Sequence, residues 1–295
     1  MSYHGADLIF PHLGIIIQHL PNHITVFGFR IAFYGIIIGA GMLLGLAVAQ
    51  WDAKRRGQDP ELYLDFALYA IILSVIGARL YYVAFEWGYY GKHPLEILNI
   101  RGGGLAIYGG ILAAILTAIV YTRVKKISFL QLADTGVLGL ITGQIVGRWG
   151  NFFNAEAFGG YTDSLFAMRL KESIVNPSMI SADVAAHRIL DDGIAYLQVH
   201  PTFLYESCWN LCALCFLIWF GKHRQKWTGQ IFFLYLLYYG VGRFFIEGLR
   251  TDQLLIPGTS LAVSQCLSAV LAVLSAAVLL LSGIKQKKAA DQRLL

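Results

Sequence analysis

The chain has 295 residues, of which 57% are hydrophobic and 14% charged, and its mean hydropathy is +0.58. Soluble domains carry about a quarter charged residues, so this composition excludes a soluble enzyme. The net charge of +5 does not predict nucleic-acid binding, because the basic residues lie at the ends of apolar runs, where anionic lipid headgroups are the nearer partner. We therefore expect an integral membrane protein.

Seven apolar runs are long enough to cross a bilayer as helices, which takes about 20 residues each. The predicted fold class is an all-α integral membrane protein with seven transmembrane helices. The predicted spans cover residues 27–50, 63–86, 104–122, 129–148, 203–221, 229–247 and 260–283.

Two segments outside the spans differ from ordinary loops. Residues 8–20 are apolar but short, and Pro11 interrupts them, so we expect an N-terminal interfacial segment at 1–26. Residues 161–200 form the longest polar stretch, which we expect to fold as a small external head. The predicted division is therefore the N-terminal segment at 1–26, spans one to four at 27–148, an outer loop and head at 149–202, spans five to seven at 203–283, and a cytoplasmic tail at 284–295.

The distribution of Lys and Arg predicts the orientation of the spans. The connections near residues 54–56, 123–126 and 222–226 and the tail from residue 285 hold 13 of the 23 basic residues, whereas residues 1–26 hold none. Because cytoplasmic loops carry the excess of Lys and Arg, we expect the N-terminus outside and the C-terminus in the cytoplasm.

The cysteines and histidines do not predict a metal or haem centre. All four cysteines lie inside apolar runs, where neither a zinc site nor an extracellular disulfide framework is expected. All eight histidines lie outside the apolar cores, so paired haem ligands within the bundle are not expected. The N-terminus also lacks the basic region and cleavage site of a removable signal peptide, and none is expected.

Four arginines fall within or at the rim of the predicted spans, namely Arg30, Arg79, Arg148 and Arg243. A charge inside a bilayer costs at least about 2.5 to 3.5 kcal/mol, so each needs a counter-charge, a water-filled cavity or an anionic headgroup. Arg30 and Arg79 can alternatively reach an interface along their aliphatic stems. That explanation is weaker for Arg148 and Arg243.

A polar run begins at the outer end of the fourth span, with the sequence GRWGNFFNAEAFGG at residues 147–160. It combines Arg148 with Asn151, Asn154, Glu156 and four glycines, which are too many polar groups to leave unpaired at the edge of the hydrocarbon. Glycines let backbone N–H groups approach a ligand closely, and the Arg fork of donors matches phosphate oxygens. The run predicts an anion site or, alternatively, a polar cap that ties the span to the head.

The sixth span carries Tyr239, Arg243, Glu247 and Arg250 at steps of four, four and three. On a helix these residues share a face. One interpretation is that Arg243 and Glu247 form an ion pair that neutralises both charges and has only a structural role in packing. The other is that the second arginine leaves net positive charge, which an anionic ligand would balance.

Two further segments contain candidate functional residues. Residues 101–110, RGGGLAIYGG, form a glycine-rich entry to a helix, which predicts either a phosphate cradle or a close approach of two helices. His200, before Pro201 at the start of the fifth span, is either an exposed loop residue or a proton carrier.

The run from Gly147 to Gly159 resembles the signature of the bacterial prolipoprotein diacylglyceryl transferase family, and the specificity of this signature is high. The resemblance extends over nearly the whole chain. Its further matches are Tyr34-Gly35, the GARLYY segment at 77–82, the glycine-rich turn at 102–110, His200-Pro201 with Tyr205-Glu206, and the sixth-span residues 239–247.

The resemblance implies a seven-span enzyme of the bacterial inner membrane with an external head. The family transfers the diacylglyceryl group of phosphatidylglycerol to the thiol of the lipobox cysteine in a preprolipoprotein signal peptide, forming a thioether and releasing glycerol phosphate. The partners expected from the resemblance are phosphatidylglycerol, the preprolipoprotein and membrane lipid, with no metal, soluble cofactor or nucleic acid.

The resemblance also implies roles for particular residues, with the two arginines engaging the lipid headgroup. The expected catalytic residues are Tyr108, Arg148, Asn151, Glu156, Arg243, Glu247 and His200. The expected substrate-binding residues are Arg148, Arg243, Tyr34, Asn154, Gly159 and Tyr239.

One position departs from the family pattern, because Tyr108 stands where many members have a histidine that is discussed as a catalytic base. A tyrosine with a pKa of about 10 is a poor base at neutral pH unless positive charge lowers that pKa. Either Tyr108 is tuned in this way, or it only positions groups and another residue or the lipid phosphate takes the thiol proton.

Two other functional classes stay open. A transporter for an anionic solute would also place arginines inside the bilayer, and a non-catalytic protein could bind lipid without consuming it. The polar groups crowd at the outer end of the spans rather than at the midplane, where transporters usually bind substrate. This placement favours the transferase.

Overall fold

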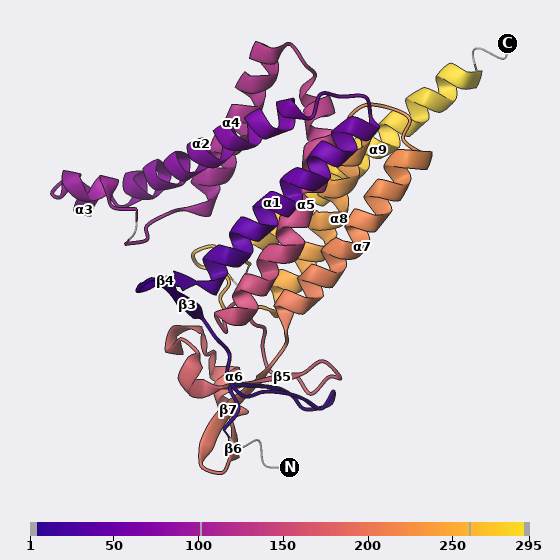
Figure 1. The fold of residues 1–295 in the computed structure, drawn as a ribbon. Helices are drawn as coiled ribbons and strands as arrows, with labels where there is room; N and C mark the ends of the chain where they lie inside the picture. The colour runs from indigo at the N-terminus through magenta and orange to yellow at the C-terminus, as the bar shows by residue number, and fades with distance from the viewer. Residues whose placement is uncertain (1–4, 101, 260, 292–295) are drawn as a thin grey trace. The chain divides into compact units, whose positions relative to one another are not determined.

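A computed structural model describes residues 5–100, 102–259 and 261–291 of the chain. Within these residues seven helices are long and apolar enough to cross a membrane, which confirms the predicted seven-span helical architecture (Figure 1). They are α1 (Phe33–Arg55), α2 (Glu61–Phe85), α4 (Ile107–Lys125), α5 (Phe129–Phe153), α7 (Thr202–His223), α8 (Gln230–Leu249) and α9 (Val263–Asp291).

The first helix begins six residues later than predicted. A hairpin of β3 (His23–Val26) and β4 (Phe29–Ala32) occupies the expected start of the span, and Phe27 and Gly28 form its turn with positive φ angles of 48° and 81°. Two such residues are what a tight turn between right-twisted strands requires. Arg30 therefore lies exposed in β4 opposite Thr25, three residues before α1 begins, and so at the rim of the span rather than within it.

The chain forms two compact units, one that runs up to residue 45 and from residue 138 onward, and one that covers residues 46–137. In the second unit α2 and α4 pack along each other, together with the short α3 (Trp87–Tyr90) and the 3-10 helix η1 (Pro94–Leu98). A Cβ on Gly109 would lie 2.5 Å from the carbonyl oxygen of Gly77, so the glycines let the two backbones touch. For Gly109, the interpretation as a close helix approach is confirmed.

Arg79, near the end of α2, is buried and 5% exposed. Its guanidinium donates to five backbone carbonyls of the following connection, with N–O distances from 2.5 to 3.1 Å, including those of Gly103 and Gly104. Its guanidinium carbon also lies 5.0 Å from the centre of the Tyr90 ring. Arg79 thus holds the connection between α2 and α4 together, rather than reaching toward an interface on its own.

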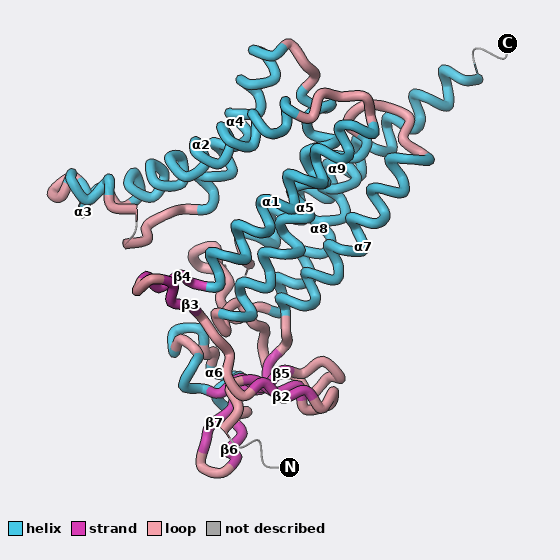
Figure 2. Tube along the Cα trace, viewed as in Figure 1, coloured by secondary structure: helices cyan, strands magenta, loops and turns pink. Residues whose placement is uncertain are grey.

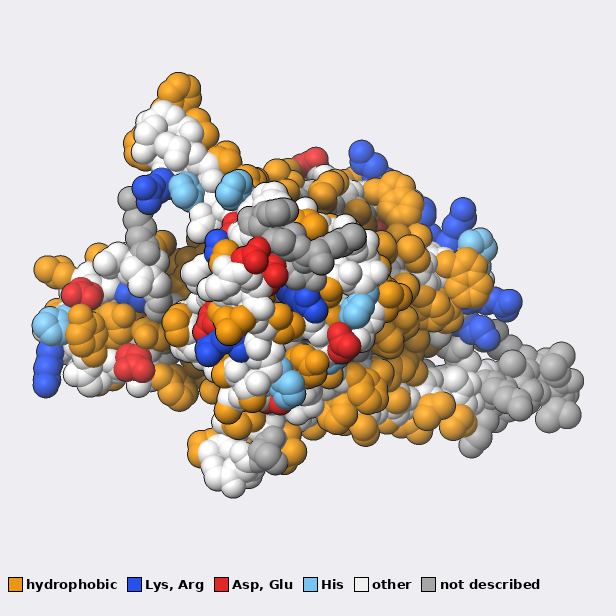
Figure 3. All heavy atoms as spheres, turned by 90° about the horizontal axis from the view of Figure 1, so that it is seen from below, with side chains coloured by type: hydrophobic (Ala, Val, Ile, Leu, Met, Phe, Trp, Pro, Cys, Tyr) orange, Lys and Arg blue, Asp and Glu red, His pale blue; other side chains and the backbone are white. Residues whose placement is uncertain are grey.

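The first unit contains a head built on a five-stranded antiparallel sheet (Figure 2). The strand order is β2 (Ile15–Ile17), β1 (Leu8–Phe10), β5 (Met168–Lys171), β7 (Ile194–Val199) and β6 (Ile189–Asp191). The short elements η2 (Glu172–Ile174), η3 (Pro177–Met179) and α6 (Ala182–Ala186) lie between β5 and β6 in the chain. Figure 3 shows acidic, basic and histidine side chains gathered over this head.

The N-terminal residues do not form a separate interfacial segment throughout, which corrects the sequence expectation. β1 pairs with β5, placing Leu8 opposite Leu170, and both side chains are fully buried. An apolar stretch of three consecutive buried residues is typical of a strand covered on both faces. Leu13, Ile15 and Ile16, by contrast, are 40 to 48% exposed.

The helices of the first unit meet through small residues. A Cβ on Gly45 in α1 would lie 2.5 Å from the carbonyl oxygen of Gly139 in α5. A Cβ on Gly242 in α8 would collide with the Trp209 ring of α7, whose indole nitrogen donates to the carbonyl of Tyr238 at 3.0 Å. Close packing of α7 on α8 positions the side chain of Arg243, which follows Gly242.

Candidate functional site

A cluster of charged side chains joins α5, α7 and α8 near one end of these helices. Arg148 Nη2 lies 2.6 Å from Glu206 Oε1, and Arg243 Nη1 donates to Glu206 Oε2 at 3.0 Å. Arg243 Nη2 lies 2.6 Å from Glu247 Oε2, one turn along α8. The structure thus brings Arg148 and Arg243 together across a single carboxylate.

The helix directions explain why these residues meet. Arg148 lies in the second-to-last turn of α5, and Arg243 and Glu247 lie toward the end of α8, whereas Glu206 lies one turn after the start of α7. Two helices therefore end, and one begins, at the same level. Glu206 and Glu247 are each 3% exposed, so both carboxylates need the partners they have.

The two 2.6 Å contacts are ion pairs that hold Glu206 Oε1 and Glu247 Oε2 each against one guanidinium nitrogen. A guanidinium has five N–H donors, so Arg148 and Arg243 each keep donors beyond these contacts that another acceptor can use.

The charges of the cluster balance, which corrects the expectation of net positive charge on α8. Arg250 donates to Asp252 through two nitrogens, at 2.8 and 2.6 Å, and lies 4.0 Å from Glu247. Burial raises the pKa of Asp252, but the hydrogen bonds to its carboxylate and the positive charges of Arg250 and Arg243 together outweigh burial, so that the carboxyl pKa is below its usual value. Three arginines therefore face three carboxylates, Glu206, Glu247 and Asp252.

The polar run after Arg148 forms the end of α5 and the turn that follows. Arg148 Nη1 lies 3.5 Å from Asn151 Oδ1, and Asn151 Nδ2 donates to Glu156 Oε1 at 2.9 Å. Ala155, with a φ of 48°, ends the helix in the left-handed region, and the backbone N–H of Glu156 donates to the Asn151 carbonyl at 3.0 Å. Asn151 thus links the arginine cluster to Glu156, whereas Asn154 is exposed.

Gly159 and His200 lie where the run meets the start of α7. The Gly159 N–H donates to the His200 carbonyl at 3.0 Å, and a Cβ on Gly159 would lie 2.8 Å from both the His200 Cβ and the carbonyl of Leu249. His200 Nδ1 lies 3.3 Å from the Tyr205 hydroxyl, next to Glu206 in sequence. Partial burial lowers the pKa of His200 below its usual value.

Two expected tyrosines also belong to this unit. The Tyr239 side chain of α8 lies close to the Arg148 side chain. Tyr34, near the start of α1, lies against α5, because a Cβ on Gly150 would be 2.9 Å from its ring. Tyr34 is 38% exposed, so its ring covers the helix at the edge of the cluster.

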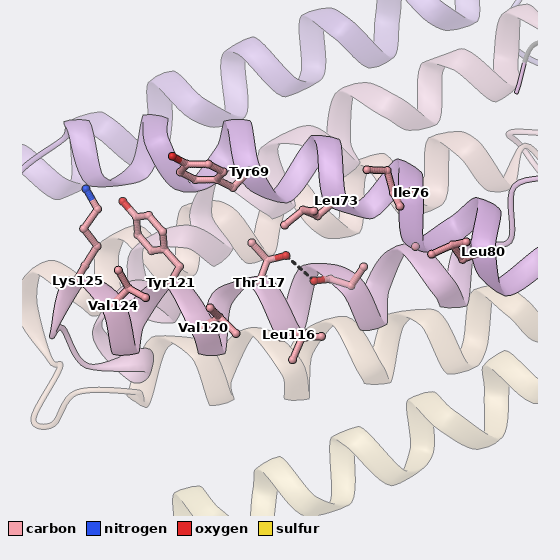
Figure 4. A pocket seen from close by; sticks show the side chains of 12 residues that line it. Tyr69, Leu73, Ile76, Leu80, Leu116, Thr117, Val120, Tyr121, Val124 and Lys125 are labelled. Carbon is pink, nitrogen blue, oxygen red and sulfur yellow. Dashed lines mark hydrogen bonds between the residues drawn. The ribbon is translucent and has the colours of Figure 1, made fainter. Parts of the chain in front are cut away.

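Tyr108 lies in the other compact unit, in the first turn of α4, and is half-buried. The same unit has an apolar groove of about 590 Å³ along α2 and α4 (Figure 4). The charged residue that lines this groove, Lys125, pairs with Asp65 at 3.1 Å. The groove offers an apolar surface, and the paired arginines and carboxylates belong to the first unit.

Glu206 is the functional residue that sequence reasoning left out of the expected site. The sequence did indicate Glu206, since a carboxylate one turn inside an apolar span needs a counter-charge as much as an arginine does. Among the residues that the structure describes, no group of three or more His, Cys, Asp or Glu side chains is placed to hold a metal ion.

Comparison with known proteins identifies the family. Residues 21–281 match the model of the family described as "Prolipoprotein diacylglyceryl transferase". A phosphatidylglycerol–prolipoprotein diacylglyceryl transferase of Bacillus cytotoxicus is 43% identical over 249 residues, which cover 84% of this chain and 86% of the relative. A protein of the same name from Geobacillus kaustophilus is 42% identical over 274 residues, which cover 92% and 91%. The chain therefore belongs to the prolipoprotein diacylglyceryl transferase family.

Proposed function

We propose that this multi-pass bacterial membrane protein transfers the diacylglyceryl group of phosphatidylglycerol to the lipobox cysteine of a preprolipoprotein. The relatives named above carry both substrates in their names. The observation that carries the proposal within the structure is the pair of arginines from two spans, Arg148 and Arg243, aligned by one buried carboxylate. Such a pair has the fork geometry that a phosphate binds.

The reaction makes one bond and breaks one. The cysteine sulfur attacks the glyceryl carbon that carries the phosphate ester, and the carbon–oxygen bond breaks with its electron pair moving to the phosphate oxygen. The products are the diacylglyceryl thioether and glycerol phosphate, and the thiol proton leaves with a base or with the phosphate. Thiolate is the nucleophile, so a positive field that favours it assists the attack.

Arg148 and Arg243 act on the leaving group. Negative charge grows on the phosphate as the bond breaks, and N–H donors in a site of low dielectric stabilise that charge more than water would. Glu206 and Glu247 hold the two guanidiniums in place before the lipid arrives, so little reorganisation accompanies the reaction. The N–H donors that these carboxylates leave unused bind the phosphate.

The proton of the thiol has two candidate acceptors. His200 lies beside Tyr205 at the start of α7, and its lowered pKa keeps the imidazole neutral and able to accept a proton near pH 7. Tyr108 is the second, from the position where many family members have histidine. Each is tested by its own substitution.

The activity is tested in proteoliposomes that contain phosphatidylglycerol and a lipobox peptide, with mass analysis of the peptide. We expect the peptide to gain a diacylglyceryl thioether and glycerol phosphate to appear in equal amount, whereas a peptide with serine in place of cysteine stays unmodified. Binding of phosphatidylglycerol without product would favour a lipid-binding protein, and flux of an anionic solute without product would favour a transporter.

We propose that the head, with the N-terminus, faces outside and that the C-terminus is cytoplasmic, on the basis of the asymmetry in basic residues. Asp183→Cys in the head should react with a membrane-impermeant thiol reagent in intact cells, in a variant whose four native cysteines are replaced by serine. Lys226→Cys, in the connection between α7 and α8, should react only after permeabilisation. The reverse pattern would overturn the orientation.

A further inference from the structure

A second layer of polar side chains lies one helical turn deeper than the charged cluster. Gln144 precedes Arg148 by four residues on α5, and Asn210 follows Glu206 by four residues on α7. Tyr239 and Tyr235 precede Arg243 by four and eight residues on α8. Residues four apart share a helix face, so the three helices that carry the charged layer also carry this uncharged one.

Contacts within α8 and between helices hold the deeper layer together. Gln144 Nε2 donates to the Tyr235 hydroxyl at 3.0 Å, and the Tyr235 and Tyr239 rings stack with centroids 5.7 Å apart. Ser207, one turn before Asn210, donates to the carbonyl of Ile145 at 3.0 Å, which joins α7 to α5 beside Gln144. The layer is therefore built across α5, α7 and α8.

The amides of this layer have polar atoms without a partner. Asn210 is fully buried, and neither its Nδ2 nor its Oδ1 forms a hydrogen bond within the described part of the chain. Gln144 Oε1 is likewise buried and unpaired there. Burying such groups without partners is unfavourable, and an apolar side chain of the same size would pack at lower cost. The unpaired atoms point to a ligand group that both donates and accepts.

The chemistry of that group follows from the atoms it would meet. Two unpaired amide oxygens accept and one amide nitrogen donates, which two hydroxyl groups match, whereas an ammonium can only donate. The layer itself carries no charge. One helical turn rises about 5.4 Å, a distance that the three carbons of a glycerol can bridge from a phosphate held in the charged layer.

We infer that Gln144 and Asn210 bind the two free hydroxyls of the glycerol headgroup while Arg148 and Arg243 hold the phosphate. This inference rests on the proposed function and makes the two amides specificity-determining residues for a lipid with a polyol headgroup. The charged layer selects the phosphodiester, and the deeper layer selects what is esterified to it. A site built to hydrogen-bond a hydroxyl rejects an analogue that lacks it, because its own buried groups then stay unpaired.

The test compares phosphatidylglycerol with phosphatidylpropanol, which has the same phosphodiester and acyl chains but no headgroup hydroxyls. The measured quantity is kcat/KM for thioether formation on a lipobox peptide. We expect the parent protein to prefer phosphatidylglycerol by at least roughly a hundredfold. Asn210→Leu should lower transfer from phosphatidylglycerol at least about tenfold and leave transfer from phosphatidylpropanol unchanged, so that the preference shrinks.

A second variant and a control keep the test decisive. Gln144→Met should reduce the preference in the same way, and it replaces Asn210→Leu if that variant fails to insert. Thr142→Val is the matched control, because Thr142 is buried on the same helix but its hydroxyl already donates to the Leu138 carbonyl at 2.7 Å. It should leave the preference at the parent value.

Three results would overturn the inference, and they differ from one another. Equal use of the two lipids by the parent would mean that water alone satisfies the amides, while the proposed function stands. A proportional loss with both lipids in Asn210→Leu and Gln144→Met would assign these residues a structural role. Failure of the parent to consume either lipid would overturn the proposed function and the inference with it.

Discussion

Glu206→Gln removes the charge that Arg148 and Arg243 share while it keeps the shape of the side chain. Removing one partner of a buried ion pair costs about 3 to 5 kcal/mol. Arg243 retains Glu247 at 2.6 Å, whereas Arg148 retains only Asn151 at 3.5 Å and the nearby Tyr239 side chain. The Arg148 side chain is 21% exposed, and solvent reduces the cost to about 2 to 3 kcal/mol.

This loss should appear as a lower thermal unfolding midpoint of the purified protein in neutral detergent. A destabilisation of about 2 to 3 kcal/mol corresponds to a shift of about 4 to 12 °C for a chain of this length class. Phosphatidylglycerol in the micelles should restore much of the midpoint in Glu206→Gln, because the lipid phosphate supplies the missing negative charge between the arginines. Phosphatidylcholine, which is neutral overall, should restore much less.

The matched control is Glu172→Gln in the head. Glu172 pairs with Arg188 at 2.6 Å, but both side chains are more than a quarter exposed, so this pair contributes only up to about 1 kcal/mol. The reasoning is refuted if Glu206→Gln is as stable as Glu172→Gln. It is also refuted if phosphatidylglycerol raises the midpoint of Glu206→Gln no more than that of the parent.

The remaining predictions concern activity and one connection. Arg148→Lys and Arg243→Lys should insert but transfer at least about tenfold more slowly at limiting phosphatidylglycerol, since lysine keeps the charge and loses the planar fork of donors. A kcat/KM equal to that of the parent in both variants would refute the binding of the phosphate by these two arginines. If His200 takes the proton, the activity of the parent should fall only below pH 6.5, because a lowered pKa means that the imidazole is protonated only at lower pH. His200→Gln should abolish this pH dependence, and Tyr108→Phe should retain it. Activity at the parent level in His200→Gln, with loss in Tyr108→Phe, would move the base to the tyrosine. Arg79→Lys, with three donors for five carbonyls, should speed amide hydrogen exchange in the connection after α3 by roughly a hundredfold, and unchanged exchange would contradict the anchoring role.

Local composition was enough to predict the spans and to single out Arg148 and Arg243. A backbone in hydrocarbon must satisfy its own polar groups, so an apolar run of sufficient length becomes a helix almost regardless of its neighbours. An arginine within such a run is costly wherever the fold places it, and this makes it visible before any partner is known. Glu206 obeys the same rule, and it could have been included on that ground.

The partners of these residues could not be predicted, because pairing across helices depends on contacts between residues far apart in the chain. Glu206 lies 58 residues from Arg148 and 37 from Arg243, and no spacing rule connects them. The expected net positive charge was wrong for this reason, since the carboxylates that neutralise the arginines include Glu206 from α7 and Asp252, three residues after the end of α8.

The head and the deeper polar layer could likewise not be predicted from local sequence, because both depend on contacts between distant segments. A three-residue apolar strand such as β1 is too short to be identified from hydropathy alone. Its burial depends on pairing with β5, more than 150 residues later in the chain. Gln144 and Asn210 look like isolated polar residues in apolar spans until three helices place them at one depth. Hydropathy is a property of each segment, and so the sequence alone determined which segments cross the membrane. A binding site is a property of side chains that meet, and only the tertiary structure decided which side chains those are.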